Sequence, residues 1–256
     1  PSADHERTLP LDTHLLRTEI TKLRRELSEI REEHSHLKST FHRVMDRLLI
    51  ACEYEDDKIE SHLRRLSKYC RTIGETIGLS AKEIEDLEWA APLHDIGNVG
   101  VPDRLLLKPG RLSEQEFGLV KAHTVIGARL LSNNRTSMMT RAREIALSHH
   151  ERWDGKGYPA GLKKSQIPLS ARIVCLVDNF DALTSSRPHK MAYPVDVACD
   201  IIQSQRERIF DPTLVPALRD SLDKLIKVKA AIDTPERMPS YQFTFSERDS
   251  LATSEG

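Results

Sequence analysis

The chain has 256 residues, enough to bury a sizeable core as one large domain or as one domain with an attachment. Its 38 basic and 39 acidic residues give a formal net charge of −1, so no global field attracts nucleic acid or an anionic membrane. No run approaches the roughly 20 apolar residues of a membrane helix, and no signal-peptide pattern is present. Four isolated cysteines without CxxC spacing indicate reduced thiols. We expect a cytoplasmic protein that binds neither DNA nor membranes.

The N-terminal part of the chain carries a seven-residue apolar pattern. Residues 1–12 are expected to form a flexible segment. After them, apolar residues recur at steps of four and three, with charged residues between them, at Leu16, Ile20, Leu23, Leu27, Ile30, Leu37, Phe41, Val44 and Leu48. This spacing is typical of a left-handed coiled coil, so residues 13–50 are predicted to form a signalling helix that pairs in a parallel homodimer. The alternative is a single amphipathic helix folded back on its own domain.

Capped helices follow this segment. Ser80 and Glu83 have capping-box spacing, and their helix brings His94 and Asp95 to its C-terminal end. Ser113 and Glu116 repeat the pattern before a helix that holds His123 near its middle.

Two more predicted helices carry polar residues on apolar faces. The helix in 137–151 ends at His149 and His150, and the one in 170–185 holds Asp178 among apolar residues. A long glycine-containing turn, 154–161, lies between them. Because alternating strand patterns are scarce, we predict an all-α fold, with a globular domain over 51–232 and a loosely held tail over 233–256.

These helices bring together residues of the kinds that bind metals: His62, His94, Asp95, His123, His149, His150 and Asp178. A lone histidine on an apolar face is more often a core residue, but burying this set without a cation would cost about 1 to 3 kcal/mol for each unpaired group. Imidazole and carboxylate suit Fe, Mn, Zn, Ni or Co, and the absence of ligating cysteines argues against a zinc finger. We predict at least two ions, which the carboxylate of Asp95 could bridge.

A bridged pair of ions predicts hydrolysis of a phosphate ester. Such a pair lowers the pKa of a shared water and binds the attacking and leaving oxygens of an in-line displacement at phosphorus. The polar run 187–190 supplies cations suited to phosphate oxygens, in Arg187 and Lys190. On its own, this run would be interpreted as a solvated helix end.

Seven motifs, from about Ala51 to Leu222, resemble those of the HD-GYP phosphodiesterases in kind and order. HD-GYP proteins are a subgroup of the HD metal-dependent phosphohydrolases. The motifs are HLRR at 62–65, HDIG, KPGRLSEQEF, KAHTVIGARLL, HHERWDGKGYPAGL, IPLSARIVCLVDNFDALTSSRP and FDP. The resemblance implies an HD-type helical bundle around a bi- or trinuclear centre, here placed after an N-terminal coiled-coil helix. It also implies hydrolysis of the bacterial second messenger cyclic di-GMP to linear pGpG or GMP.

The resemblance also implies roles for single residues. The metal ligands would be His62, His94, Asp95, His123, His149, His150 and Asp178, with Asp95 as the bridge. The catalytic positions would be Asp95 and Asn98. Arg187 and Lys190 would contact the substrate, and Tyr158 would shape the pocket within the GYP loop. Asp154 and Gly155 would fix that loop.

Three positions depart from the family pattern. Many members have lysine where this chain has Asn98, and asparagine brings neither charge nor a useful pKa to the scissile phosphate. Members with three metals carry a bridging glutamate where this chain has Lys58, which predicts two divalent ions, with Fe, Mn or Ni favoured. His189 replaces an aromatic residue, which we interpret as a tolerated change at the pocket edge.

Three functions are therefore compared. The first is a cyclic di-GMP phosphodiesterase whose stalk transmits a signal from an upstream receiver or sensor domain. The second is a metal-bearing cyclic di-GMP receptor with weak turnover, as Asn98 suggests. The third is an HD phosphohydrolase that acts on another nucleotide.

Overall fold

A computed structural model describes residues 13–52, 58–133, 136–186 and 191–234. Across these ranges the regular structure is helical, with one isolated bridge between Arg206 and Phe210, so the predicted all-α class is confirmed. The α-helices are α1 (Thr13–Cys52), α2 (Lys58–Thr76), α3 (Ala81–Ala90), α4 (Asp103–Leu106), α5 (Glu114–Leu130), α6 (Ser137–Ser148), α7 (Leu169–Thr184), α8 (Val195–Ser204), α9 (Leu214–Asp220) and α10 (Leu222–Asp233). Short 3-10 helices are η1 (Ala91–Leu93), η2 (Ile96–Gly100) and η3 (Lys164–Gln166).

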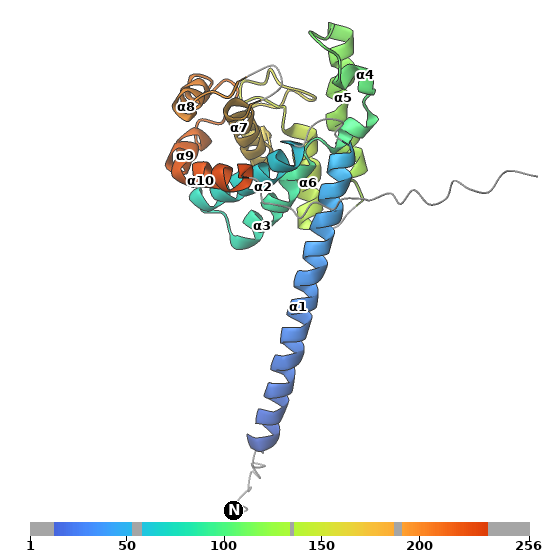
Figure 1. Ribbon diagram of the computed structural model, residues 1–256, viewed down its shortest axis with the longest axis vertical. Helices are drawn as coiled ribbons and strands as arrows, with labels where there is room; N and C mark the ends of the chain where they lie inside the picture. The colour runs from blue at the N-terminus through green and yellow to red at the C-terminus, as the bar shows by residue number, and fades with distance from the viewer. Residues whose placement is uncertain (1–12, 53–57, 134–135, 187–190, 235–256) are drawn as a thin grey trace, which may run out of the picture.

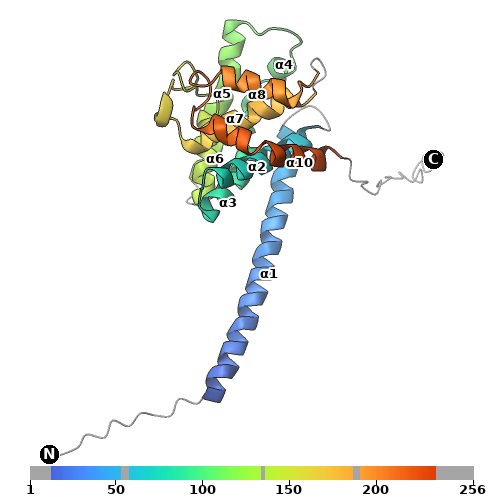
Figure 2. The same ribbon diagram turned by 90° about the vertical axis from the view of Figure 1, so that its left-hand side faces the viewer.

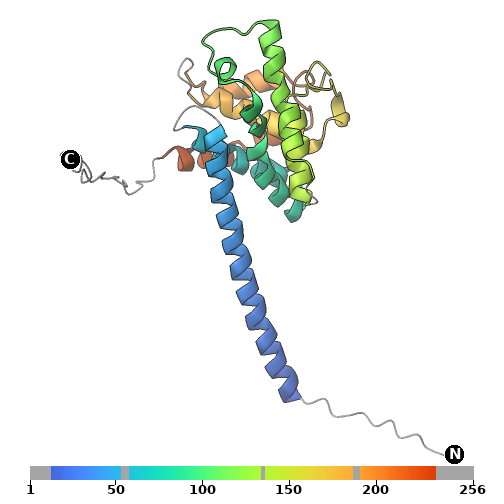
Figure 3. The ribbon, with the colours of Figure 1, turned by 90° about the vertical axis from the view of Figure 1, so that its right-hand side faces the viewer.

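Helix α1 projects as a long stalk from a bundle formed by the other helices (Figures 1 and 2). Its C-terminal end contacts α2 and η2 (Figure 3). The apolar seam along it is 44% to 67% exposed at Leu16, Ile20, Leu23, Leu27, Ile30, Leu37 and Val44. The charged faces beside the seam carry ion pairs one turn apart, such as Arg25 with Glu29. The predicted seam also includes Phe41 and Leu48, whose side chains the structure does not describe.

Helices α2 and α7 form the centre of the bundle. Leu66, Tyr69 and Ile73 on α2 are fully buried, and Tyr69 packs edge-on against Phe180 of α7 with ring centroids 5.7 Å apart. Around them pack α3, α6, α8, α9 and α10. None of the described helices combines the length and the apolar character needed to span a membrane.

Both predicted capping boxes are present. The Ser80 hydroxyl accepts from the Glu83 backbone N–H, while the Glu83 carboxylate accepts from the Ser80 backbone N–H; Ser113 and Glu116 do the same for α5. Helix α3 ends at Ala90, earlier than the sequence suggests, and the chain reaches the HDIG motif through η1. The HDIG motif is therefore carried by two short 3-10 helices, with His94 at the end of η1 and Asp95 at the start of η2, and not by α3 itself.

The C-terminal helix extends one residue past the predicted domain boundary. Asp233, assigned to the tail by its sequence, is the last residue of α10, and its carboxylate pairs with Arg65 and Lys229. The predicted flexible segment 1–12 and the remainder of the predicted tail, 235–256, lie outside the described residues.

Candidate metal centre

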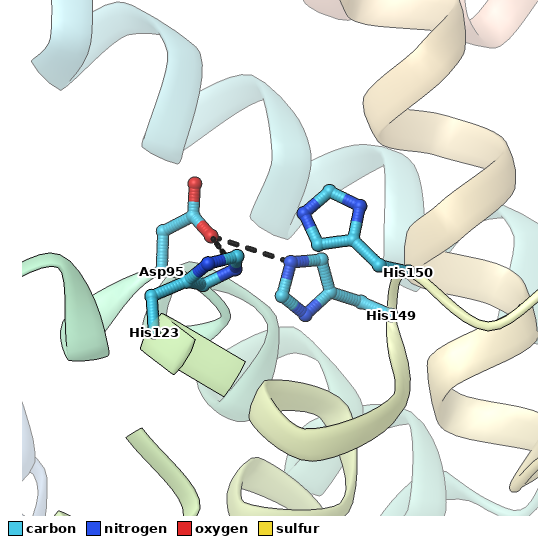
Figure 4. Close-up of side chains that lie close together, drawn as sticks. All are labelled: Asp95, His123, His149 and His150. Carbon is cyan, nitrogen blue, oxygen red and sulfur yellow. Dashed lines mark ion pairs between the residues drawn. The ribbon is translucent and has the colours of Figure 1, made fainter. Parts of the chain in front are cut away.

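All seven predicted ligands lie together, in two clusters at the middle of the bundle. The Asp95 cluster comprises Asp95, His123, His149 and His150 (Figure 4), and the His62 cluster comprises His62, His94 and Asp178. Within each cluster the candidate ligand atoms lie within 4.8 Å of one another. They come from α2, the turn between η1 and η2, α5, the end of α6, and α7, so the site forms only when five parts of the chain assemble.

Gly97 sets how closely the HDIG segment approaches α5. A Cβ at this position would lie 1.9 Å from the carbonyl oxygen of His123 and 2.6 Å from the backbone nitrogen of Gly127. Only glycine therefore permits η2 to rest directly on the backbone of α5. That contact places Asp95, two residues earlier, beside the imidazole of His123.

The buried imidazoles are oriented by their own helices. In each, Nδ1 lies within hydrogen-bonding distance of a carbonyl oxygen in the preceding turn: 2.7 Å from His123 to Val120, 3.0 Å from His149 to Ile145, and 3.1 Å from His94 to Ala91. A carbonyl can only accept, so Nδ1 carries the proton in these bonds, and a neutral ring then presents a lone pair at Nε2. A hydrogen bond from one ring nitrogen, which leaves the other nitrogen free to bind an ion, is typical of metal-ligating histidines.

Asp95 lies where these lone pairs converge. Its Oδ1 is 3.3 Å from Nε2 of both His123 and His149 (Figure 4). Its Oδ2 is 3.5 Å from Nε2 of His94. Oδ1 and the Nε2 atoms of His123 and His149 are buried, yet none has a hydrogen-bond partner. Lone pairs facing one another are repulsive unless a cation lies among them, so the arrangement fits bound metal ions. Each carboxylate oxygen of Asp95 faces a different cluster.

His62 is oriented by a carboxylate rather than by a carbonyl. Its Nδ1 is 2.8 Å from Oδ2 of Asp181, and its Nε2 is directed toward Asp178, 3.7 Å away. Asp181 in turn accepts two hydrogen bonds from Arg65, which also donates to Asp233 of α10. The sequence interpretation missed Asp181, although it lies three residues after Asp178 on the same helix.

Neighbouring charges set the protonation of these groups. Burial opposes ionisation of Asp95, but where a proton takes the place of a cation between the carboxylate and the imidazoles of His94, His123 and His149, these rings outweigh burial and hold the pKa of Asp95 well below its usual range. Burial, reinforced by His149, lowers the pKa of His150 to about 2. The carboxylate is therefore charged and the His150 ring neutral near pH 7, as metal ligands must be.

The GYP loop folds back on the end of α6. The buried carboxylate of Glu151 accepts from the backbone N–H groups of Ala160 and Leu162, at 2.7 and 3.0 Å. Gly157 allows the loop to pack against the backbone of residues 150–152, where a Cβ would lie 2.4 Å from a nitrogen atom. The ring of Tyr158 consequently stacks on His150, with centroids 4.7 Å apart. Glu151 holds the loop, a function that its sequence context did not reveal.

The centre opens to solvent on its carboxylate side. The side chains of Asp95 and Asp178 are 29% and 26% exposed, whereas those of His94, His123 and His149 are at most 4% exposed. Asn98 lies in η2, and its backbone N–H donates to the carbonyl of Asp95. The predicted substrate contacts Arg187 and Lys190 lie outside the described residues.

Comparison with known proteins identifies the family. The HD domain family model matches residues 49–214, more than half of the chain, and the chain belongs to this family. A cyclic di-GMP phosphodiesterase of Thermotoga maritima is 38% identical over 229 residues, covering 81% of this chain and 62% of that protein. The cyclic di-GMP phosphodiesterase response regulator RpfG of Xanthomonas campestris is 43% identical over 196 residues, covering 77% of this chain and 52% of that protein.

A solved structure shares the fold. The cyclic GMP-AMP specific phosphodiesterase V-cGAP3 of Vibrio cholerae matches with a TM-score of 0.55 and 20% identity, covering 75% of this chain and 53% of that one. The resemblance to the HD-GYP phosphodiesterases is thus confirmed, as is the HD-type helical fold. The chain spans about three fifths and one half of the lengths of the two curated relatives.

Proposed function

We propose that this protein is a metal-dependent phosphodiesterase that hydrolyses cyclic di-GMP to linear pGpG or GMP. The observation that carries the proposal is the position of Asp95, one of whose oxygens faces the unpartnered Nε2 atoms of His123 and His149 while the other faces His94. A carboxylate shared between two groups of imidazoles suits a bridged metal pair, which promotes displacement at phosphorus. The names of the curated relatives support the choice of substrate.

In this proposal each cluster would hold one ion, and Asp95 would contribute a carboxylate oxygen to each. The ions would supply an activated water and neutralise negative charge on the phosphate. The protein orients the imidazoles through their Nδ1 atoms, keeps Asp95 ionised, and leaves the carboxylate side open to the substrate. Arg187 and Lys190 would bind phosphate oxygens, and Tyr158 would form one wall of the pocket.

Two ions, rather than three, are proposed because of Lys58. The position four residues before His62 would have to supply an anionic ligand for a third ion, and lysine brings a positive charge instead. Iron, manganese and nickel all accept this mixture of imidazole and carboxylate. Elemental analysis that finds three tightly bound ions per chain would contradict the proposed number.

Product analysis tests the activity. Metal-quantified protein is incubated with cyclic di-GMP in the presence of Mn(II), anaerobic Fe(II) or Ni(II), and the nucleotides are separated by chromatography. We expect steady appearance of pGpG or GMP. Intact substrate with every metal, together with two bound ions and tight dinucleotide binding, would instead support the receptor function that Asn98 suggests. Asn98→Lys would then be expected to introduce turnover.

A different cyclic dinucleotide is the second candidate substrate. The Vibrio cholerae phosphodiesterase that shares the fold is described as specific for cyclic GMP-AMP. Competition between cyclic di-GMP and cyclic GMP-AMP in one reaction gives the ratio of their kcat/KM values directly. We expect cyclic di-GMP to be consumed first, and preferential loss of cyclic GMP-AMP would reassign the substrate.

Helix α1 is proposed to pair with α1 of a second copy of this chain. Its exposed seam repeats every 3.5 residues and is bordered by charged faces, as in a parallel two-stranded coil. Light scattering at concentrations well above micromolar should give the mass of a dimer, whereas Leu23→Lys with Ile30→Lys should give a monomer. A monomeric wild-type chain would exclude the pairing. The upstream receiver or sensor domain stays a prediction.

A further inference from the structure

The aromatic side of the Asp95 cluster holds a lysine that the sequence interpretation did not single out. Lys121 lies on α5, two residues before His123, and is half-buried. Its Nζ is 4.6 Å from the ring centroid of Phe117 and 5.3 Å from that of Tyr158. The Tyr158 ring also stacks on His150, so a single aromatic ring separates the ammonium group from a candidate metal ligand.

The contacts of Lys121 leave its positive charge unneutralised. Among the residues that the structure describes, no carboxylate forms an ion pair with Lys121. Three arginines on or next to segments that carry candidate ligands already pair with carboxylates: Arg65 with Asp181, Arg152 with Asp154 and Arg172 with Asp211. A cation held over aromatic rings keeps its charge and its N–H donors, and an anion can still bind it.

The placement of Lys121 complements the loss of charge at position 98. A dinucleotide bound at the metal centre brings two phosphodiester groups to the open side of the site. Asn98 supplies no cation there, whereas Lys121 has a flexible four-carbon stem and lies near two aromatic rings that limit where the ammonium can go.

We propose that Lys121 is a substrate-binding residue, which contacts a phosphate oxygen of the dinucleotide while Phe117 and Tyr158 hold its ammonium group beside the Asp95 cluster. This inference rests on the proposed function and deepens it. Inorganic phosphate probes Lys121 separately from turnover, because it presents the same oxygens without a bond to be cleaved.

The test compares metal-loaded wild-type protein with the Lys121→Gln variant. Titration calorimetry with inorganic phosphate should show affinity weaker by about tenfold or more in the variant, because a charge-assisted hydrogen bond contributes on that scale. KM for cyclic di-GMP should rise similarly with kcat little changed, since the contact exists before and during the reaction. Lys121→Arg should recover most of the affinity, and Phe117→Leu should weaken it by about two- to threefold.

Matched measurements separate the possible failures. Lys227→Gln removes an exposed lysine on α10 and should leave phosphate affinity, KM and metal content at wild-type values. Phosphate affinity equal in wild type and Lys121→Gln, or no phosphate binding by metal-loaded wild type, would overturn the role of Lys121. A fall in kcat alone would overturn it as well. Absence of dinucleotide cleavage by wild type, with the phosphate difference intact, would instead count against the proposed function.

Discussion

The imidazoles of His123 and His149 in the Asp95 cluster and that of His62 in the other cluster are oriented by different means. His123 and His149 bond to carbonyls of their own helices, so their rings are directed as soon as α5 and α6 form. His62 depends on Asp181 of another helix, and Asp181 belongs to a network that reaches Asp233 at the end of α10. His123 and His149, like His94, are therefore oriented locally, whereas His62 depends on tertiary packing.

This difference predicts that substitutions affect the two proposed ions unequally. A change at Asp95 should affect both, since the carboxylate faces both clusters. A change in the network between α2, α7 and α10 should weaken the His62 cluster and spare the Asp95 cluster. Four substitutions test this comparison, in order of decreasing expected effect.

Asp95→Ala should release both ions and reduce hydrolysis of cyclic di-GMP to background. The reason is that the substitution removes the one anionic group that faces both clusters. Metal content after gel filtration and product formation are the measurements. Asp103→Ala, at an exposed aspartate of α4, is the control and should retain metal and activity. Full metal occupancy in Asp95→Ala would refute the shared-carboxylate arrangement.

Gly97→Ala should separate η2 from α5 and displace Asp95 from His123. The added Cβ would overlap the carbonyl of His123, and overpacking of this kind costs about 1 to 3 kcal/mol of folding free energy. We expect a lower midpoint of thermal unfolding together with loss of metal, mainly from the Asp95 cluster. Gly118→Ala on α5, where a Cβ meets nothing within 4 Å, is the matched control and should not destabilise the protein. Equal behaviour of the two variants would contradict the close contact.

Asp181→Asn should weaken one ion selectively. Loss of a carboxylate that supports a ligating histidine typically lowers metal affinity by about 10- to 100-fold. Competition with a chelator should therefore show one weakened ion and one of nearly wild-type affinity. Asp211→Asn is the matched control, because Asp211 is also buried and paired with an arginine but contacts no candidate ligand. Equal weakening of both ions in Asp181→Asn would remove the distinction between the clusters.

Asp233→Asn should have the smallest effect. The carboxylate of Asp233 is 38% exposed and is linked to His62 only through two intervening residues, Arg65 and Asp181. Exposed ion pairs contribute about 0 to 1 kcal/mol, so metal affinity at the His62 cluster should fall by at most about fivefold. Asp200→Asn, which removes an exposed pair with Arg219, should leave metal affinity unchanged. A loss as large as that in Asp181→Asn would show that α10 controls the site more strongly than its contacts indicate.

The sequence predicted the seven clustered residues because their chemistry is local to recognisable motifs. His149 and His150 end a helix, and Asp178 follows an apolar helical pattern, so each could be placed before any tertiary contact was known. The capping boxes at Ser80 and Ser113 were equally local. Sequence pattern therefore defined both the helices and the candidate ligands.

The supporting residues could not be predicted in the same way. Asp181 and Arg65 acquire their roles from the packing of α2 against α7, which no sequence pattern specifies, although each lies three residues from a candidate ligand on its own helix. Glu151 acts on a loop about ten residues away, and Lys121 depends on where that loop places Tyr158. Such roles arise from tertiary contacts rather than from helical periodicity.

Anomalous diffraction from crystals of the metal-loaded protein would show directly whether Asp95 lies between two bound ions. Data collected on both sides of the absorption edge of the bound metal locate every ion without reference to activity. We expect two peaks per chain, one beside His123, His149 and His150 and one beside His62, His94 and Asp178, with the carboxylate of Asp95 between them. A single peak, a third peak in the centre, or peaks that Asp95 does not contact would contradict this arrangement.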